Sequence, residues 1–340
     1  MSNIGKSMRI MAAMGIAAAL WLGGCAQPQQ QGDGTAALSA DELQARRQQA
    51  VSLYVDALML NELNDYAGAL QKLEEATALD NEFALAFSLK GDLYQAQQQY
   101  AQSADAYERA SQLDPWSFKD FFNLGKVSQI LKQFERAVNA YVAAAKLDPK
   151  HYEAHLGAAK CYFELKDMDA AQQYAQKAKE LDASQADPEA LLGDILAEKK
   201  EHLEAIAAYR RALELQGNQP KIMIALARAY LRTGRFSSAK ELLADVIVAE
   251  PDNAVAHQYM GFAQLKLKET EAAVESYKTA VKLNENDWMA RKSLGVAYML
   301  WAMQNNNDEK IKALAMEQWN ISLQINPDQP QLKELKSKYN

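Results

Sequence analysis

Small residues recur along this chain with one strict period, and this period constrains the fold more than any other feature of the sequence. A strict period means that the chain is built from copies of one structural unit. Three columns of the repeat are filled mainly by alanine and glycine. The first column holds Ala57, Gly91, Gly125, Ala159, Gly193, Ala227, Gly261 and Gly295; the second holds Ala69, Ser103, Ala137, Ala171, Ala205, Ala239 and Ala273; the third holds Ala76, Ala110, Ala144, Ala178, Ala212, Val246 and Ala280.

Each unit is expected to contain two amphipathic helices, because its apolar residues are three and four positions apart. No run of useful length alternates as a strand would. Glycine inside a helix costs about 1 kcal/mol relative to alanine, so the five glycines of the first column imply a compensating gain. We attribute this gain to close approach of neighbouring helices, which a larger side chain would prevent.

The repeated unit resembles the tetratricopeptide repeat, a 34-residue helix–turn–helix unit. The resemblance covers Ala50 to Pro327 as eight repeats, and it implies an all-α fold, an α-solenoid of about eight helix–turn–helix units forming a superhelix. The motifs that carry it are Phe87-x-x-Lys90-Gly91-x-x-Tyr94 and Phe121-x-x-Leu124-Gly125 in first helices, Ala137-x-x-x-Tyr141, Ala205-x-x-x-Tyr209 and Ala273-x-x-x-Tyr277 in second helices, and Pro115, Pro149 and Pro251 at the ends of units.

The two end repeats depart from the family pattern. The first is degenerate, with Leu53 and Asp56-Ala57 at the aromatic and Leu-Gly positions. The eighth carries eight extra residues around Gln304 to Asp308. Asn305-Asn306-Asn307 predicts a turn there, and Asp308 can cap the helix that follows.

The solenoid is expected over residues 41–327, with a C-terminal capping segment over 328–340. Ser39 and Glu42 have the spacing of a capping box, which predicts that ordered structure begins there. Leu332 and Leu335 in the last segment predict a short polar helix that covers the final repeat.

The first 24 residues have the layout of a secretory signal. Lys6 and Arg9 precede an uncharged apolar stretch from Ile10 to Leu22, which is shorter than the ~20 residues that span a bilayer. The stretch ends in Leu22-Gly23-Gly24-Cys25, which resembles the bacterial lipobox. The resemblance implies a lipoprotein signal peptide over 1–24 and an acylated Cys25 as the mature N-terminus, held by several acyl chains because one gives only marginal binding.

Two other interpretations of this segment stay open: an ordinary signal cut after Ala26, and an uncleaved anchor. By the resemblance, Ala26 favours the outer membrane on its periplasmic side, since some bacteria use Asp at this position for inner-membrane retention. Residues 25–40 are then a lipidated N-terminus and a flexible tether, because they contain Gln, Gly and Pro and no aromatic residue.

The charge balance argues against nucleic acid as a partner. Loss of residues 1–24 leaves 35 of the 37 basic residues against 44 acidic ones, a net charge of −9, and nucleic-acid surfaces need an excess of base. Cys161 is the second of two cysteines, so a lipidated Cys25 leaves no intramolecular disulfide. We expect Cys161 to be a small buried hydrophobe.

No catalytic motif is found, so the chain is not expected to be an enzyme or to hold a cofactor. The sequence lacks a phosphate-binding glycine loop, HExxH and GxSxG. His151-x-x-x-His155 could hold a metal on one helix face, but no third ligand has suitable spacing. His155 and His257 occupy the repeat position where Phe87 and Phe121 stand, which favours a packing role.

Partner recognition is expected on the first helices, because these line the concave groove of tetratricopeptide arrays. The candidates run from basic to acidic to basic and then become apolar; a merely solvated surface is the alternative for the charged part. The carboxylate clamp of some family members is not expected, because Asp92, Glu153 and Gly157 stand at its positions. The predicted groove residues are Lys119, Asn123, Lys126, Lys160, Lys221, Arg228, Tyr259, Phe262 and Met299, with Gln129, Phe163, Asp187, Asp194, Glu198, Ile224, Arg232, Gln258, Leu265 and Val296 beside them.

The resulting hypothesis is a lipid-anchored scaffold that binds envelope proteins through its groove. It is similar to lipoproteins that assist pilus or secretin assembly, outer-membrane protein insertion, or peptidoglycan enzymes. One alternative is a peptidoglycan- or glycan-binding adaptor that uses aromatic platforms in the groove. The other is a metal or enzyme role through His151 and His155. The aromatic candidates are Phe122, Phe163, Tyr259 and Phe262.

Overall fold

The structure is a computed structural model that describes residues 39–339, and every regular element in that range is a helix. The all-α solenoid prediction is confirmed. None of the helices in this range combines the length and hydropathy needed to cross a bilayer. The helices are α1 (Ala40–Glu62), α2 (Tyr66–Leu79), α3 (Ala84–Ala96), α4 (Tyr100–Leu113), α5 (Phe118–Ile130), α6 (Phe134–Leu147), α7 (Tyr152–Glu164), α8 (Met168–Leu181), α9 (Ala186–Glu198), α10 (His202–Leu215), α11 (Pro220–Arg232), α12 (Phe236–Ala249), α13 (Ala254–Lys266), α14 (Thr270–Leu283), α15 (Trp288–Gln304), α16 (Glu309–Ile325) and α17 (Pro330–Tyr339).

The chain divides into two compact units, Met1–Ala45 and Arg46–Asn340. The structure describes the first unit only from residue 39, so the signal, Cys25 and most of the predicted tether lie outside the described residues. Within that unit the predicted capping box is present. The Ser39 N–H donates to Glu42 Oε2 at 2.8 Å, and the Glu42 N–H donates to Ser39 Oγ at 3.3 Å.

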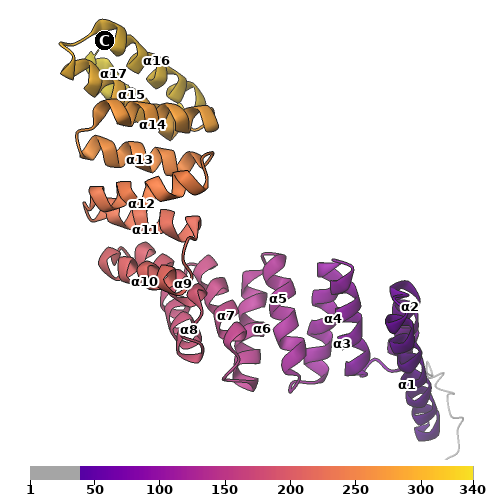
Figure 1. Cartoon of the computed structure of the whole chain (residues 1–340). Coiled ribbons are helices and arrows are strands. Elements are labelled where there is room, and N and C mark those ends of the chain that lie inside the picture. Colours follow the sequence, from indigo (N-terminus) through magenta and orange to yellow (C-terminus); the bar gives the residue numbers. More distant parts are fainter. Residues whose placement is uncertain (1–38, 340) are drawn as a thin grey trace, which may run out of the picture. The chain divides into compact units, whose positions relative to one another are not determined.

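In the second unit, helices follow one another in space in the order of the sequence (Figure 1). From α2 to α17 each helix packs against the next, so α3 to α16 form seven helix–turn–helix pairs, which we number from the second because α1 and α2 precede them. The odd-numbered first helices from α5 to α15 also contact one another. They therefore share one surface, which we call the first-helix face.

The glycine column lies beneath aromatic rings of the second helices. A Cβ built on Gly125 would lie 2.7 Å from the Tyr141 ring, and Tyr141 is itself 3% exposed. The predicted gain therefore comes from a buried ring that rests on the glycine, which brings the two helices of a pair together. The same seating joins Gly91 to Tyr107, Gly193 to Tyr209, Gly261 to Tyr277 and Gly295 to Trp319.

A second periodic feature lies in the turns that join the two helices of a pair, from α1–α2 to α13–α14, where one residue has positive φ. Only one of these residues, Gly234, is a glycine, although positive φ is unfavourable for residues with a Cβ. The glycine-based signals of the sequence therefore did not reveal the turn. The residues are Asn64, Gln98, Lys132, Lys166, Lys200, Gly234 and Lys268, at one position of the repeat and with φ from 58° to 76°.

The eighth pair accommodates its extra residues by lengthening both helices. α15 and α16 have 17 residues each, where earlier first and second helices have 13 and 14. Asp308 caps α16 as predicted, accepting the Lys310 N–H at 2.8 Å. α17 then covers the end of the array, with Leu332 2% exposed in the cluster that contains Trp319.

We predict that Gly125→Ala lowers the free energy of unfolding by up to about 2 kcal/mol. Overpacking against a buried ring costs about 1–3 kcal/mol, which exceeds the ~1 kcal/mol that alanine gains in a helix. Chemical unfolding followed by circular dichroism measures the change. Gly217→Ala is the control for a glycine substitution without overpacking: Gly217 lies in the loop between α10 and α11, and its Cβ would lie 3.8 Å from the nearest atom, Leu213 O. Equal stability of the two variants would contradict the proposed seating.

Candidate functional site

A groove of about 740 Å³ runs along the first-helix face from α5 to α13. Its lining mixes apolar and charged side chains, which suits an extended or helical protein segment. Four of the nine principal groove predictions line it, namely Lys160, Lys221, Arg228 and Tyr259, and so do Gln129, Phe163, Asp187, Asp194 and Ile224, which were predicted beside them. The other lining residues include Ile130, Lys132, Phe134, Glu164 and Val255.

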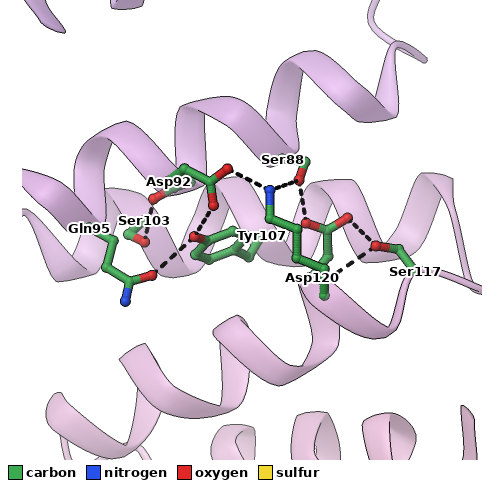
Figure 2. A network of polar contacts seen from close by, with 9 residues as sticks. Ser88, Asp92, Gln95, Ser103, Tyr107, Ser117 and Asp120 are labelled. Atoms are coloured by element: carbon green, nitrogen blue, oxygen red, sulfur yellow. Dashed lines mark hydrogen bonds and ion pairs between the residues drawn. The ribbon is translucent and has the colours of Figure 1, made fainter. Parts of the chain in front are cut away.

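Lys119 lies outside this groove lining. It contacts Ser88 and Asp92, which belong to the polar network between the second and third pairs that Figure 2 shows. Its Nζ forms an ion pair with Asp92 and donates to Ser88 Oγ at 3.2 Å. Because these contacts already use its charge, Lys119 is less available to a partner than its position in the sequence suggested.

The same network buries a carboxylate. Asp120 is 3% exposed and accepts hydrogen bonds of 2.6 Å from both Ser88 and Ser117 hydroxyls. Burying a charge is costly unless it is hydrogen-bonded, and two hydroxyl donors supply that compensation. Figure 2 shows Asp120 and Ser117 beside Ser88, so the network stabilises the start of α5 against α3.

The remaining predicted residues lie in different surroundings. Lys126 is exposed, with its Nζ 5.6 Å from the centroid of the Phe122 ring. Asn123 is half-buried, and Phe262 is 39% exposed. Met299 is 3% exposed and packs in the core between α15 and its neighbours. Its placement in the groove is wrong, because it packs in the last core cluster with Trp319 and Leu332.

Asp194 is the most enclosed charge in the groove. Tyr209 donates to its Oδ1 at 2.7 Å. Burial raises the pKa of Asp194, while that hydrogen bond and then the positive charges of Arg228 and Lys221 act in the opposite direction. Glu198 also acts on Asp194, so two carboxylates and the two cations of α11 share this part of the groove.

On the first-helix face, charged residues of successive repeats form ion pairs, and the two residues of a pair are 27 positions apart in the sequence. Lys160 Nζ and Asp187 Oδ2 are 2.9 Å apart, and Lys119 bonds Asp92 at the same two repeat positions. Opposite charges occupy these positions at four consecutive junctions, and we call the set the charge ladder. The four junctions of the ladder are Asp92–Lys119, Lys126–Glu153, Lys160–Asp187 and Asp194–Lys221. At the junction before the ladder the same two positions hold Leu58 and Leu85, and at the two junctions after it they hold Arg228 and Val255, then Phe262 and Met289.

The ladder changes the interpretation of the alternating charges in the sequence. Each charged residue taken alone is a possible contact for a partner, whereas two of the four junctions are closed by ion pairs within the chain. The signal is present in the sequence as a correlation between the two ladder positions of adjacent repeats. A comparison of residues within each helix misses it.

The histidines make local contacts that do not converge on a metal. His151 Nδ1 accepts the Ala154 N–H at 3.2 Å and caps α7, and His155 Nε2 lies 3.1 Å from Pro149 O. His257 repeats the latter contact with Pro251 O at 2.9 Å. No group of three possible metal ligands exists among residues 39–339. The packing role expected for His155 and His257 agrees with these contacts.

Cys161 has the surroundings of a structural residue. It is 0% exposed, and burial raises the pKa of its thiol to about 12. Because the thiolate is the reactive form, this thiol is unreactive at neutral pH. The expectation of a small buried hydrophobe is confirmed.

We predict a pH effect that originates at His155. Burial is the main cause that lowers its pKa below 6.5, so below that value the unfolded chain takes up a proton that the folded chain does not. Stability is therefore retained above pH 6.5 and falls as the pH decreases toward the folded-state pKa. His155→Phe should make the loss of stability between pH 7.5 and 5 shallower in thermal unfolding.

The control for this pH effect is His257→Phe, which removes the less buried counterpart at the same repeat position. Identical pH profiles for wild type and His155→Phe would contradict the assignment.

Comparison with known proteins agrees with the helix–turn–helix geometry. The family described as "Cilia and flagella-associated protein 70 C-terminal domain", a tetratricopeptide domain, matches residues 35–294. Three solved structures share the fold. The C-terminal part of a tetratricopeptide protein from Cytophaga hutchinsonii has 16% identity and a TM-score of 0.58, and the match covers 72% of this chain and 97% of that one. Cut9–Hcn1 of the APC/C has 16% identity and a TM-score of 0.56, with 81% of this chain and 52% of that one covered. YrrB, a protein "with an unusual peptide-binding site", has 18% identity and a TM-score of 0.50, with 59% of this chain and 100% of that one covered.

Proposed function

Because the chain belongs to the family of the cilia and flagella-associated protein 70 C-terminal domain, a tetratricopeptide family, we propose that it is a scaffold that binds protein segments. The binding site is the groove on the first-helix face. The observation that carries this proposal is the lining of that groove, where Ile224, Val255 and Tyr259 lie beside Lys221 and Arg228. Apolar side chains supply affinity and charges select register in such interfaces.

The fold shared with YrrB supports the same proposal, since that structure is described as having a peptide-binding site. In this chain the supporting geometry is the direct contact between successive first helices. It makes one continuous surface from several repeats, long enough for a partner segment to contact more than one repeat.

A glycan-binding role receives less support from the aromatic residues. The Phe122 ring is stacked on Phe118, with centroids 5.5 Å apart, and packs against His151 at 4.7 Å. A ring that is already covered in this way offers no free platform for a sugar. Phe122 is therefore no sugar platform, whereas Phe163 and Tyr259 line the groove. We retain the protein-binding scaffold as the function because that lining combines apolar side chains with charges.

We further propose that Cys25 anchors this scaffold in a bacterial envelope, on the periplasmic side of the outer membrane, where other envelope proteins are its partners. The support is the lipobox-like Leu22-Gly23-Gly24-Cys25 after a short apolar stretch. A tether between the anchor and α1 would leave the groove accessible to proteins of that compartment.

Cys25→Ala is expected to release the protein from membranes. The variant lacks the sulfur that carries the acyl chain, and each buried acyl CH₂ contributes ~0.8 kcal/mol to membrane binding. Cell fractionation and incorporation of labelled palmitate measure the result. Labelled fatty acid on the variant would sink the anchor proposal while leaving the groove untouched.

Photo-crosslinking tests the groove itself. A benzoylphenylalanine at Tyr259, inside the groove, should give adducts in living cells that map to one contiguous segment of a partner. The same group at Leu203, which is 59% exposed on the second helix α10, is the matched control and should not. Ile224→Asp should reduce the Tyr259 adducts at least tenfold, because it buries a charge in the interface.

Equal adducts at Tyr259 and Leu203 would mean that recognition occurs elsewhere on the array. Adducts at Tyr259 that persist in Ile224→Asp would exclude the apolar part of the groove from the site.

A further inference from the structure

The charge ladder is interrupted at one junction. At four consecutive junctions each charged residue has an opposite charge at the partner position of the next repeat, but Arg228 has Val255 there. The next junction, Phe262–Met289, has no charge at all. Arg228 is therefore the one ladder charge whose partner position is apolar.

Arg228 forms no ion pair within 4 Å among the described residues, and its side chain is exposed. Its neighbours are the Tyr209 hydroxyl and Asp194, whose charge is shared among that hydroxyl, Arg228 itself and Lys221. Glu198 lies one helical turn beyond Asp194 and acts on it electrostatically. A guanidinium offers five N–H donors, so a contact with one hydroxyl leaves several of them for the groove that Arg228 lines.

The surface beyond Arg228 is apolar and open. Val255, Phe262 and Met289 are 45%, 39% and 49% exposed, although they occupy the two ladder positions that carry charges in earlier repeats. Val255 lines the groove together with Arg228, and Phe262 and Met289 lie outside that lining. Exposed apolar side chains near a cation that lacks an ion pair are typical of an interaction site.

We propose that the groove binds a partner segment which presents an Asp or Glu side chain to Arg228 and an aliphatic or aromatic side chain to the surface of Val255, Phe262 and Met289. This inference rests on the proposed function and names the chemistry of its partner. The partner's carboxylate takes the place that an acidic residue of the chain takes at the closed junctions. A guanidinium–carboxylate pair adds geometric selection as well as charge.

The geometry also restricts the spacing in the partner. Adjacent helix axes are about 8–10 Å apart, and an extended chain advances about 3.3 Å per residue. The acidic residue and the apolar residue are therefore expected about three positions apart in an extended segment that crosses from α11 to α13.

The substitution Val255→Glu provides a sharp test, because it restores the opposite charge that the other ladder junctions carry. The new carboxylate should form an ion pair with Arg228 and so exclude the carboxylate of the partner. The thermal unfolding temperature should stay within about 2 °C of wild type, since exposed ion pairs contribute roughly 0–1 kcal/mol. The variant thus distinguishes loss of recognition from loss of folding.

The probe is a phage-displayed library of random dodecapeptides, selected on the full mature chain. We expect enriched peptides to share Asp or Glu about three positions from an apolar residue. For a synthetic fluorescent copy, replacing the acid by its amide should weaken binding ten- to thirtyfold in wild type. In Arg228→Gln and in Val255→Glu, replacing the acid by its amide should weaken binding less than threefold. The control is Arg211→Gln, which removes a second-helix charge paired with Glu214; this variant should distinguish the acid from the amide as strongly as wild type does.

The outcomes separate this inference from the function on which it rests. Tyr259 photo-adducts together with peptides that lack an acid, or that ignore Arg228→Gln, would overturn the inference and leave the groove as a binding site. Failure to enrich any peptide would overturn the inference as well, and the absence of Tyr259 adducts would remove the proposed function itself.

Discussion

The seating of an aromatic ring on a helix glycine determines the packing of five of the seven pairs, and in two of them it also determines the chemistry of the surface. The Tyr107 and Tyr209 rings rest on Gly91 and Gly193, and the tight approach brings their hydroxyls within 2.7 Å of Asp92 and Asp194. Those carboxylates are ladder positions on the first-helix face. A core contact therefore sets the hydrogen bonding of the charges that a partner meets.

The charge ladder has more influence on specificity than on stability. Exposed ion pairs contribute little free energy because water and salt screen them. Their effect on binding is larger, since a charge that is satisfied within the chain gains less from an incoming partner. The charges of the two closed junctions, Asp92–Lys119 and Lys160–Asp187, accordingly describe the array itself, whereas the apolar end of the groove and Arg228 describe what it binds.

The sequence was sufficient for the fold because the repeat period, the glycine column and the capping signals all depend on local spacing. The caps at Ser39 and Asp308 lie where their side chains predicted. The site was predicted less well, because its residues are defined by contacts between repeats. Met299 shows the limit: its repeat position suggested the surface, but it is buried in the last core cluster, which includes Trp319 of α16 and Leu332 of α17. The positive-φ turns were equally hidden, since lysine occupies the position that glycine normally signals.

The ladder also bears on how such an array can gain or lose whole units. Removing the third repeat would place Asp92 opposite Glu153, and removing the fifth would place Lys160 opposite Lys221, so both losses create like charges. The fourth repeat differs, because it carries Glu153 at one ladder position and Lys160 at the other. Its removal would leave Lys126 opposite Asp187, and its duplication would add another opposite pair. Among the three central repeats, the fourth alone can be copied or discarded during the history of the gene without a clash of charge.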